Sequence, residues 1–267
     1  MIRNILNIKF IQVAALCLVL QAVLLENYVL AGNHVPSPPV SPFIEAEGNV
    51  RILYKLNPFN FLGEFKQRIE GDDFNFRYRS LTLGTYYRIM KNLKIGAFYR
   101  FQQGARHDND WIEDATDWVW ASTETRSEHL ALFDITPRVK LDFMPGKNWV
   151  FELKSRYSYN TYNSHHLLRI RPGLTYFWID GLDPFMNFYL QYEVYIPLNY
   201  STKVFYERWL YLGSLYHFNQ IVKFGIFGSY REITWTNSAG FDKVYPGSEY
   251  EKTFRSIMLG INFVFVL

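Results

Sequence analysis

Two short segments of this sequence combine histidine with residues that assist it in hydrolysis. Residues 107–110 read His-Asp-Asn-Asp, and an acid beside a histidine can activate water as a general base. Residues 164–166 read Ser-His-His, and a serine bonded to a histidine base can act as a nucleophile. Nothing identifies a second acid–histidine pair for the first segment, and the strand motifs expected of outer-membrane phospholipases are not evident around the second. We therefore predict no catalytic residue, and a lipid or peptide hydrolase with its site in these outer segments is the alternative.

Metal and cofactor chemistry finds no support in the sequence. Cys17 is the only cysteine, and it lies in the apolar amino-terminal segment, so thiolate metal sites are excluded from the rest of the chain. Calcium loops with alternating acids and phosphate-binding glycine loops are also absent from the sequence. We predict neither a metal nor a cofactor.

Basic residues that alternate with apolar ones offer a different chemistry. Charged and apolar side chains alternate along 138–143 and 151–157. This alternation predicts strands with one charged face. We place this face in the interior of a barrel. The predicted basic cluster of the lumen is Arg88, Arg100, Arg138, Lys140, Lys154, Arg156, Arg169, Arg171, Lys223 and Arg231. Its predicted acidic partners are Glu152, Glu193 and Glu207.

Hairpin geometry predicts which of these charges meet, because opposed residues keep a constant sum of residue numbers across a tight turn. The predicted contacts are Glu152 with Arg138 or Lys140, Glu193 with Arg169 or Arg171, Glu207 with Arg231, and Arg156 beside Arg169 or Arg171. Positive charge is left in excess. This pattern suits an anion-preferring pore or a site for acidic groups, and it suits equally a plugged lumen filled by a ladder of ion pairs.

The elements that must position these residues are strands. The chain has 267 residues, of which 49% are apolar, 20% charged and 19% aromatic. Alternation is nearly continuous after residue 47, and helical periodicity is hard to find. The predicted strands lie near 48–56, 60–69, 76–89, 93–103, 127–143, 148–161, 165–179, 184–196, 203–218, 220–235 and 252–267.

The amino terminus has the pattern of a secretory signal. A basic start is followed by an apolar run and by small residues before Gly32. We predict a signal peptide over 1–31, a proline-rich linker over 32–47 and a barrel domain over 48–267.

The connections alternate between short and long, as in outer-membrane barrels. Tight turns at 90–93, 144–148 and 180–184 contrast with the long segments 104–127 and 236–251, which we expect to face outside the cell. Aromatic residues gather near strand ends, as the interfaces of a membrane require. An antiparallel barrel with both ends in the periplasm needs an even strand number, so we predict twelve strands with an extra one over 41–47, or ten without 48–56. A soluble secreted barrel is the alternative.

Several strand motifs resemble a bacterial family called domain of unknown function 2490. They lie at 61–68, 83–88, 95–101, 169–176, 192–195, 207–213 and 228–232. The resemblance implies an outer-membrane barrel without an assigned activity. Two departures are the segment 104–127, which is longer than usual, and the final Leu267, where such barrels usually end in an aromatic residue.

Together these observations predict an all-β, antiparallel transmembrane barrel of the bacterial outer membrane. We predict a structural envelope protein or a narrow anion-preferring channel. The expected partners are outer-membrane lipids, the barrel-assembly machinery acting on the carboxyl-terminal strand, and small anionic solutes. A net charge of +3 gives no reason to expect nucleic acid. Three tryptophans, Trp111, Trp118 and Trp120, could instead make the long 104–127 segment a docking surface.

Overall fold

The computed structural model describes residues 43–70, 75–107, 123, 125–181, 183–201, 204–236 and 251–267. The predicted signal peptide, most of the predicted linker, Asp108 to Asp110 and the three tryptophans of 104–127 lie outside the described residues. Within the described part every regular element is a strand, which confirms the all-β prediction. No helix of the described residues is long and apolar enough to cross a membrane.

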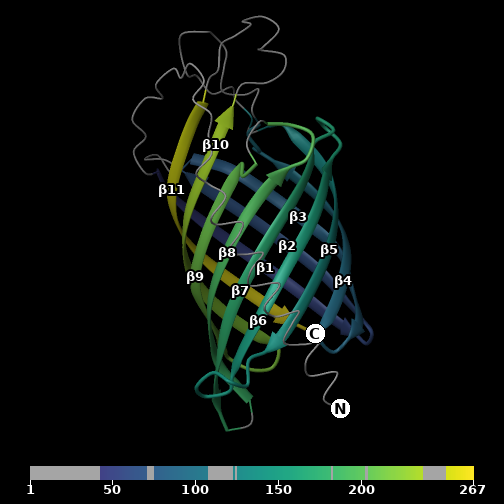
Figure 1. Cartoon of the computed structure of the whole chain (residues 1–267), viewed down its shortest axis with the longest axis vertical. Coiled ribbons are helices and arrows are strands. Elements are labelled where there is room, and N and C mark those ends of the chain that lie inside the picture. The colour runs from purple at the N-terminus through teal and green to yellow at the C-terminus, as the bar shows by residue number, and fades with distance from the viewer. Residues whose placement is uncertain are drawn as a thin grey trace, which may run out of the picture. The chain divides into compact units, whose positions relative to one another are not determined.

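Eleven strands of the described chain close into one barrel (Figure 1). They are β1 (Phe43–Leu56), β2 (Phe59–Glu70), β3 (Asn75–Met90), β4 (Leu93–Gln103), β5 (Ser127–Lys140), β6 (Trp149–Asn160), β7 (His166–Asp180), β8 (Asp183–Pro197), β9 (Glu207–His217), β10 (Val222–Thr236) and β11 (Glu251–Val266). Each strand is hydrogen-bonded to its neighbours in sequence, and β1 closes the wall against β11.

The prediction of twelve strands, or of ten, is wrong. Residues from Phe43 to Leu56 form a single strand, so the extra strand expected over 41–47 and the strand expected over 48–56 are one element. Glu45, Glu47 and Asn49 are buried inside, whereas Ile44 and Val50 are exposed, and this alternation begins within the predicted linker. Residues 43–47 of the predicted linker are therefore part of the wall.

The closing pair explains how an odd number of strands makes a complete wall. β1 and β11 run parallel, with Ile44 opposite Ile257 and Ile52 opposite Phe265, whereas every other pair is antiparallel. A parallel pair satisfies the backbone with slanted hydrogen bonds, so no edge remains. The expectation of a purely antiparallel barrel is corrected at this pair alone.

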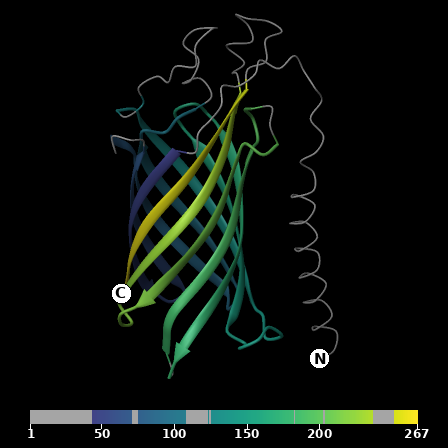
Figure 2. The same ribbon diagram turned by 90° about the vertical axis from the view of Figure 1, so that its left-hand side faces the viewer.

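Connection lengths separate the two ends of the barrel only in part. The turns at 57–58, 91–92, 141–148, 181–182 and 218–221 are short and lie at the end where the chain finishes (Figure 2). The longest connection, 104–126, joins strands at the opposite end, which we call the loop end, but the connection 161–165 at that end is shorter than 141–148. β1 starts at the loop end, because Glu45 pairs with Glu70 at the far end of β2.

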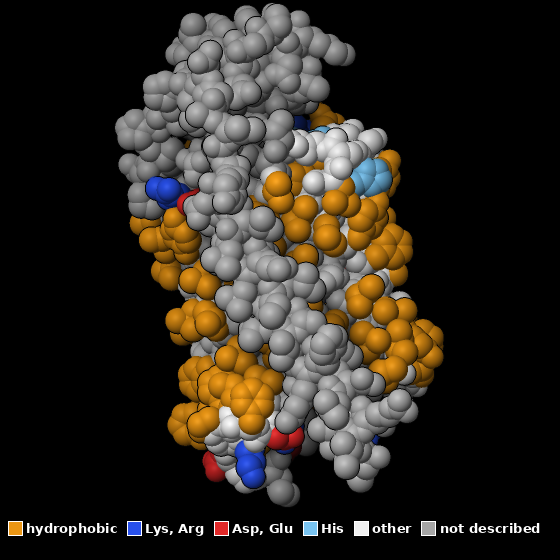
Figure 3. Space-filling model, viewed as in Figure 1, with side chains coloured by type: hydrophobic (Ala, Val, Ile, Leu, Met, Phe, Trp, Pro, Cys, Tyr) orange, Lys and Arg blue, Asp and Glu red, His pale blue; other side chains and the backbone are white. Residues whose placement is uncertain are grey.

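The outer face of the wall is apolar. Leu212, Ile226 and Leu259 are more than half exposed, and Figure 3 shows hydrophobic side chains between charged groups near the two ends of the molecule. The inner face is polar, with Glu64, Glu128 and other charged side chains buried. This reverses the arrangement of a soluble barrel, in which the apolar face points inward.

Aromatic and aliphatic side chains fill one side of the interior. Leu62, Tyr86, Phe98 and Leu132 form a buried cluster on β2 to β5. Phe98 fits there because glycines face it, and a Cβ on Gly84 would lie 2.5 Å from the Phe98 ring and 2.3 Å from a backbone oxygen. The interior is therefore filled at this level of β2 to β5, and these strands face open space only nearer the loop end.

Candidate functional site in the barrel lumen

A cavity of about 680 Å³ lies inside the barrel. On β7 to β11 its lining extends along most of each strand, for example from Arg169 to Thr175 on β7 and from Asn187 to Tyr195 on β8. On β3 to β5 the described lining residues are confined to the part nearer the loop end, such as Tyr78, because the aromatic cluster fills the rest. The cavity thus follows one side of the lumen for much of its height.

Positive charge dominates the described lining of this cavity. Nine lysine and arginine side chains line it, against four carboxylates. The cations are Arg51, Lys66, Arg68, Arg100, Arg106, Arg156, Arg169, Arg171 and Arg231, and the acids are Glu45, Glu47, Glu193 and Glu207. Two further carboxylates, Glu64 and Asp134, contact Arg51 and Arg156.

The structure divides the predicted lumen residues into two groups. Those that line the cavity are Arg100, Arg156, Arg169, Arg171, Arg231, Glu193 and Glu207. Those outside it are Arg88, Arg138, Lys140, Lys154, Lys223 and Glu152. Lys154 is buried beside Asp134, whereas Arg138 and Lys140 are exposed close to the turn end and pair with Glu152 and Asp142.

Asp134 on β5 is the centre of the most tightly bonded group. Its two carboxylate oxygens accept hydrogen bonds from Nε and Nη2 of Arg156 at 2.5 and 2.7 Å. Lys154 Nζ lies 2.9 Å from the same carboxylate, and the Tyr86 hydroxyl donates to it at 3.1 Å. A bidentate arginine fork forms charge-assisted hydrogen bonds, which are stronger than bonds between neutral groups. Arg156 and Lys154 are therefore held in place on the filled side of the lumen.

Four cations form a square on the inner face of β6 and β7. Arg156 lies directly opposite Arg169, and Lys154 lies directly opposite Arg171. Like charges in such positions repel each other. The flanking strands supply the compensation, since Asp134 on β5 contacts the two β6 cations and Glu193 on β8 contacts the two β7 arginines, at 3.3 and 3.5 Å. The sequence predicts these Glu193 contacts correctly.

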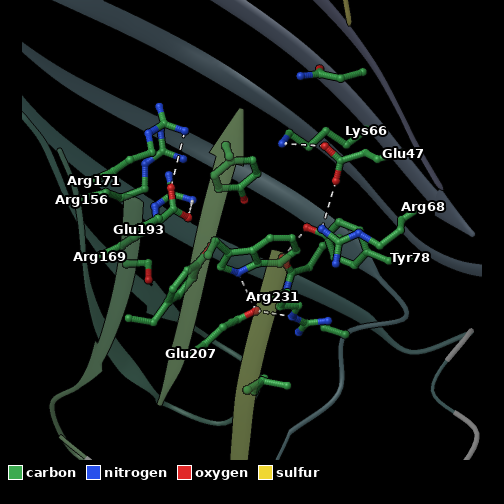
Figure 4. A pocket seen from close by; sticks show the side chains of 18 of the residues that line it. Glu47, Lys66, Arg68, Tyr78, Arg156, Arg169, Arg171, Glu193, Glu207 and Arg231 are labelled. Atoms are coloured by element: carbon green, nitrogen blue, oxygen red, sulfur yellow. Dashed lines mark hydrogen bonds and ion pairs between the residues drawn. The ribbon is translucent and has the colours of Figure 1, made fainter. Parts of the chain in front are cut away.

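A second group surrounds Trp209 on β9, which pairs with Glu193 of β8, and Figure 4 shows its members Arg68, Glu207 and Arg231. The guanidinium carbons of Arg68 and Arg231 each lie 5.0 Å from the Trp209 ring centroid, within the range of a cation–π contact. The indole Nε1 donates to Glu207 at 2.8 Å, and Arg231 Nε donates to the same oxygen at 2.6 Å. The predicted contact of Glu207 with Arg231 is confirmed.

The sequence did not reveal the charges of β1 and β2. Glu47 contacts Lys66 and Arg68 at 3.2 and 3.0 Å, and Glu45 contacts Arg68 at 3.4 Å. Assigning 32–47 to a linker hid these acids. Their regular alternation with Ile44, Ala46 and Gly48 is the signal that could have found them.

At the loop end, the structure brings together the two histidine segments. Glu128 is fully buried and bonds to His107 Nε2 at 2.7 Å and to Arg126 Nε at 3.1 Å. The His107 and His165 rings are 5.8 Å apart, and His165 stacks on Tyr200 at 3.9 Å. Burial lowers the pKa of His165 to about 4, with the charge of His107 as a smaller cause.

Metal binding finds no support in the described residues, since no group of three or more histidine, cysteine or acidic side chains could hold an ion. Comparisons with protein-family models and with curated proteins found no match to this chain. The resemblance to domain of unknown function 2490 therefore stays a prediction.

Proposed function

We propose that this protein is an outer-membrane β-barrel whose lumen provides a narrow, anion-preferring path. The observation that carries the proposal is the described lining of the cavity, with nine cationic side chains against four carboxylates. Rings of basic side chains favour anions because they replace part of the hydration shell and repel cations. The hollow side along β7 to β11 gives this charge a continuous space to act in.

The outer face supports a membrane location. The strands have between 11 and 16 residues, which suffices for the roughly 9–11 residues that a tilted strand needs to cross a bilayer. Near the loop end, Arg208, Glu232 and Arg255 form a row across three strands, with Glu232 directly opposite both arginines. Charged side chains on the outer face are expensive in the middle of a bilayer and tolerable at its surface. This row fits one edge of a lipid-facing band.

The remaining features of the proposal follow from this location. The loop end would face outside the cell, and β11 would present the carboxyl-terminal strand to the assembly machinery. Lipids would cover the apolar band, and small anions would enter from the loop end. The eleven strands depart from the even number typical of single-chain bacterial barrels, so the support comes from the two faces of the wall and not from strand parity.

The test is the conductance of refolded protein in a planar bilayer under a potassium chloride gradient. We expect discrete channels whose reversal potential shifts toward that of chloride. The double variant Arg169→Gln and Arg171→Gln should reduce this preference. The matched control is Lys140→Gln, which removes one positive charge outside the cavity and should leave the potential nearly unchanged. Cation preference, or silence from folded protein, would contradict the path and leave a structural envelope protein.

A hydrolytic site at the loop end is the second candidate, and one contact favours it. His107 and Glu128 form an acid–histidine pair at 2.7 Å beside His165. Glu128 also binds Arg126, Gln102 and Asn160. A carboxylate that only stabilises the structure would make the same contacts. If hydrolysis of a lipid or peptide is detected, His107→Ala together with His165→Ala should abolish it. Unchanged hydrolysis would remove this candidate.

A further inference from the structure

We propose that Arg169 and Arg171, with Arg156 beside them, form a binding station for phosphate-type oxyanions, and that Glu193 is the internal carboxylate such an anion displaces. This inference rests on the proposed function, because the anion must be able to enter the lumen. It goes further by naming the chemical class of solute and the position at which the path holds it.

The two halves of the cation square are bonded very differently. Asp134 accepts hydrogen bonds from Arg156 at 2.5 and 2.7 Å, and a further contact from Lys154 at 2.9 Å. Glu193 lies 3.3 and 3.5 Å from the nearest nitrogens of Arg169 and Arg171. Neither oxygen of Glu193 has a hydrogen bond of full geometry, and its one polar neighbour besides the cations is the Tyr195 hydroxyl, although the residue is only 1% exposed.

This difference makes Glu193 a replaceable partner. A buried carboxylate normally has its hydrogen bonds satisfied, and leaving it without them is costly. Glu193 is also the carboxylate that neutralises Arg169 and Arg171, and its contacts with both arginines are long. An anion that offers more oxygens and more charge can therefore bind the arginines better than Glu193 does.

The geometry of the arginines selects the class of anion. Both guanidinium groups approach a single carboxylate from neighbouring inward positions of β7, so they can converge on one group of similar size. Guanidinium forks match the oxygens of phosphate in a bidentate way, and a dianion gains more from them than a monovalent carboxylate. Chloride has no such directional match. Phosphate and phosphate-bearing solutes are therefore the expected class.

The station is open to the cavity and lies within its positive lining. Arg156, Arg169, Arg171 and Glu193 all line the cavity, and Figure 4 shows the three arginines around Glu193 on one wall. Arg100 lines the same space and donates from Nε to Thr82 Oγ1 at 3.0 Å rather than to a carboxylate. The path around the station is therefore basic as well.

The first experiment measures binding of inorganic phosphate to the refolded full chain by calorimetry and by the shift in thermal unfolding. The wild-type protein should bind and be stabilised. Glu193→Gln removes the competing charge, so we expect several-fold tighter binding and a larger thermal shift. Glu152→Gln is the control, since it makes the same change in a carboxylate that pairs with Arg138 outside the cavity, and it should behave as wild type.

A second variant keeps the proposal testable if Glu193→Gln does not fold. Arg171→Lys preserves the charge but removes the fork, so phosphate affinity should fall several-fold while the preference for chloride over potassium persists. Equal phosphate affinity in Arg171→Lys and wild type would overturn the station. So would a Glu193→Gln protein that folds but binds phosphate no better than Glu152→Gln does.

The outcomes separate this inference from the proposed function. Phosphate binding by a protein that conducts no ions would keep the station and remove the path. Anion-selective conductance without phosphate binding, and without block of the chloride current by phosphate, would keep the path and overturn the station.

Discussion

Asp134 and Arg156 face each other across the β5–β6 pair and share two hydrogen bonds, at 2.5 and 2.7 Å. This fork is reinforced by Lys154 and by the Tyr86 hydroxyl, which belongs to the aromatic cluster of β2 to β5. The ion pair and the cluster together fill one side of the lumen. The barrel therefore has a side specialised for packing and a side on which charged groups surround open space.

Removing the Asp134 charge should destabilise the barrel strongly. In Asp134→Asn, two buried cations lose their main partner, and breaking a buried pair in this way costs about 3–5 kcal/mol. Unfolding by urea in detergent micelles should show this loss. The control Glu152→Gln breaks the Arg138 contact, whose side chains are 45% and 31% exposed, and should cost no more than about 1 kcal/mol. Equal losses would contradict the assignment of Asp134 as the buried centre.

Adding one methyl group at Gly84 should disturb the filled side. Its Cβ would lie 2.3 Å from the backbone oxygen of Ala97, which cannot move without distorting the β3–β4 pair. We expect Gly84→Ala to lower the free energy of unfolding by about 1–3 kcal/mol, the range for overpacked interiors. At Gly48 nothing lies within 4 Å of the added Cβ, so Gly48→Ala is the matched control and should be nearly neutral. A neutral Gly84→Ala would show that the close approach is not maintained in solution.

A positive charge placed in the middle of the apolar band should interfere with membrane insertion. Leu259 is 63% exposed on the outer face of β11, and arginine at such a depth costs about 2–4 kcal/mol in membrane barrels. Leu259→Arg should therefore fold poorly into lipid vesicles, as judged by heat-modifiable migration on gels. Thr253→Arg, on the same strand next to the Arg208–Glu232–Arg255 row, is the control and should cost about 0–1 kcal/mol. Equal folding of the two variants would argue against a lipid-facing band.

The packing at the loop end should depend on pH between about 6.5 and 4. The pKa of His165 is about 4 in the folded protein because of burial, below its ordinary value of 6.5. The unfolded state therefore binds the proton first as the pH falls, so the contribution of neutral His165 is complete above pH 6.5 and lost toward pH 4. The hydrogen-exchange protection factors at 161–166, which are corrected for the intrinsic pH dependence of exchange, should fall as the pH is lowered over this window.

The variant His165→Phe keeps an aromatic ring for Tyr200 to stack on and removes the titrating group. It should abolish the part of the pH dependence that comes from this residue. His107 and Glu128 face His165, and His166 is a further nearby charge, so a remaining dependence would report on these groups. An unchanged pH profile would contradict the assignment to His165.

Many contacts in the lumen could be predicted from the sequence, because a tight turn fixes which residues of the two strands lie opposite each other. Once the turn at 181–182 is recognised, the contacts of Glu193 with Arg169 and Arg171 follow from residue numbers, and the structure shows both. The same reasoning places Arg156 beside Arg169, which the register confirms. Inward and outward faces follow equally well, since the side-chain period of a strand is two.

Depth along the barrel could not be predicted in the same way. Arg138 and Lys140 continue the inward face of β5, so alternation assigns them to the lumen, but they lie close to the turn end and are exposed. The tilt and stagger of the strands decide how deep in the barrel a residue lies, and neither can be read from a single sequence. The contact of Trp209 with Arg68 is hidden for another reason, because β9 and β2 are distant in sequence and their inner faces meet only when the wall closes.

The parallel pairing of β1 with β11 places the start and the finish of the wall at opposite ends of the barrel. Phe43 enters the wall at the loop end, and Val266 leaves it at the opposite end. A barrel with an even strand number would expose both ends to one compartment. If the barrel spans a membrane as proposed, a tag fused directly before Phe43 and a tag fused after Leu267 would be reached by antibodies from opposite sides of it. The same chain could thus present one appended domain on each side.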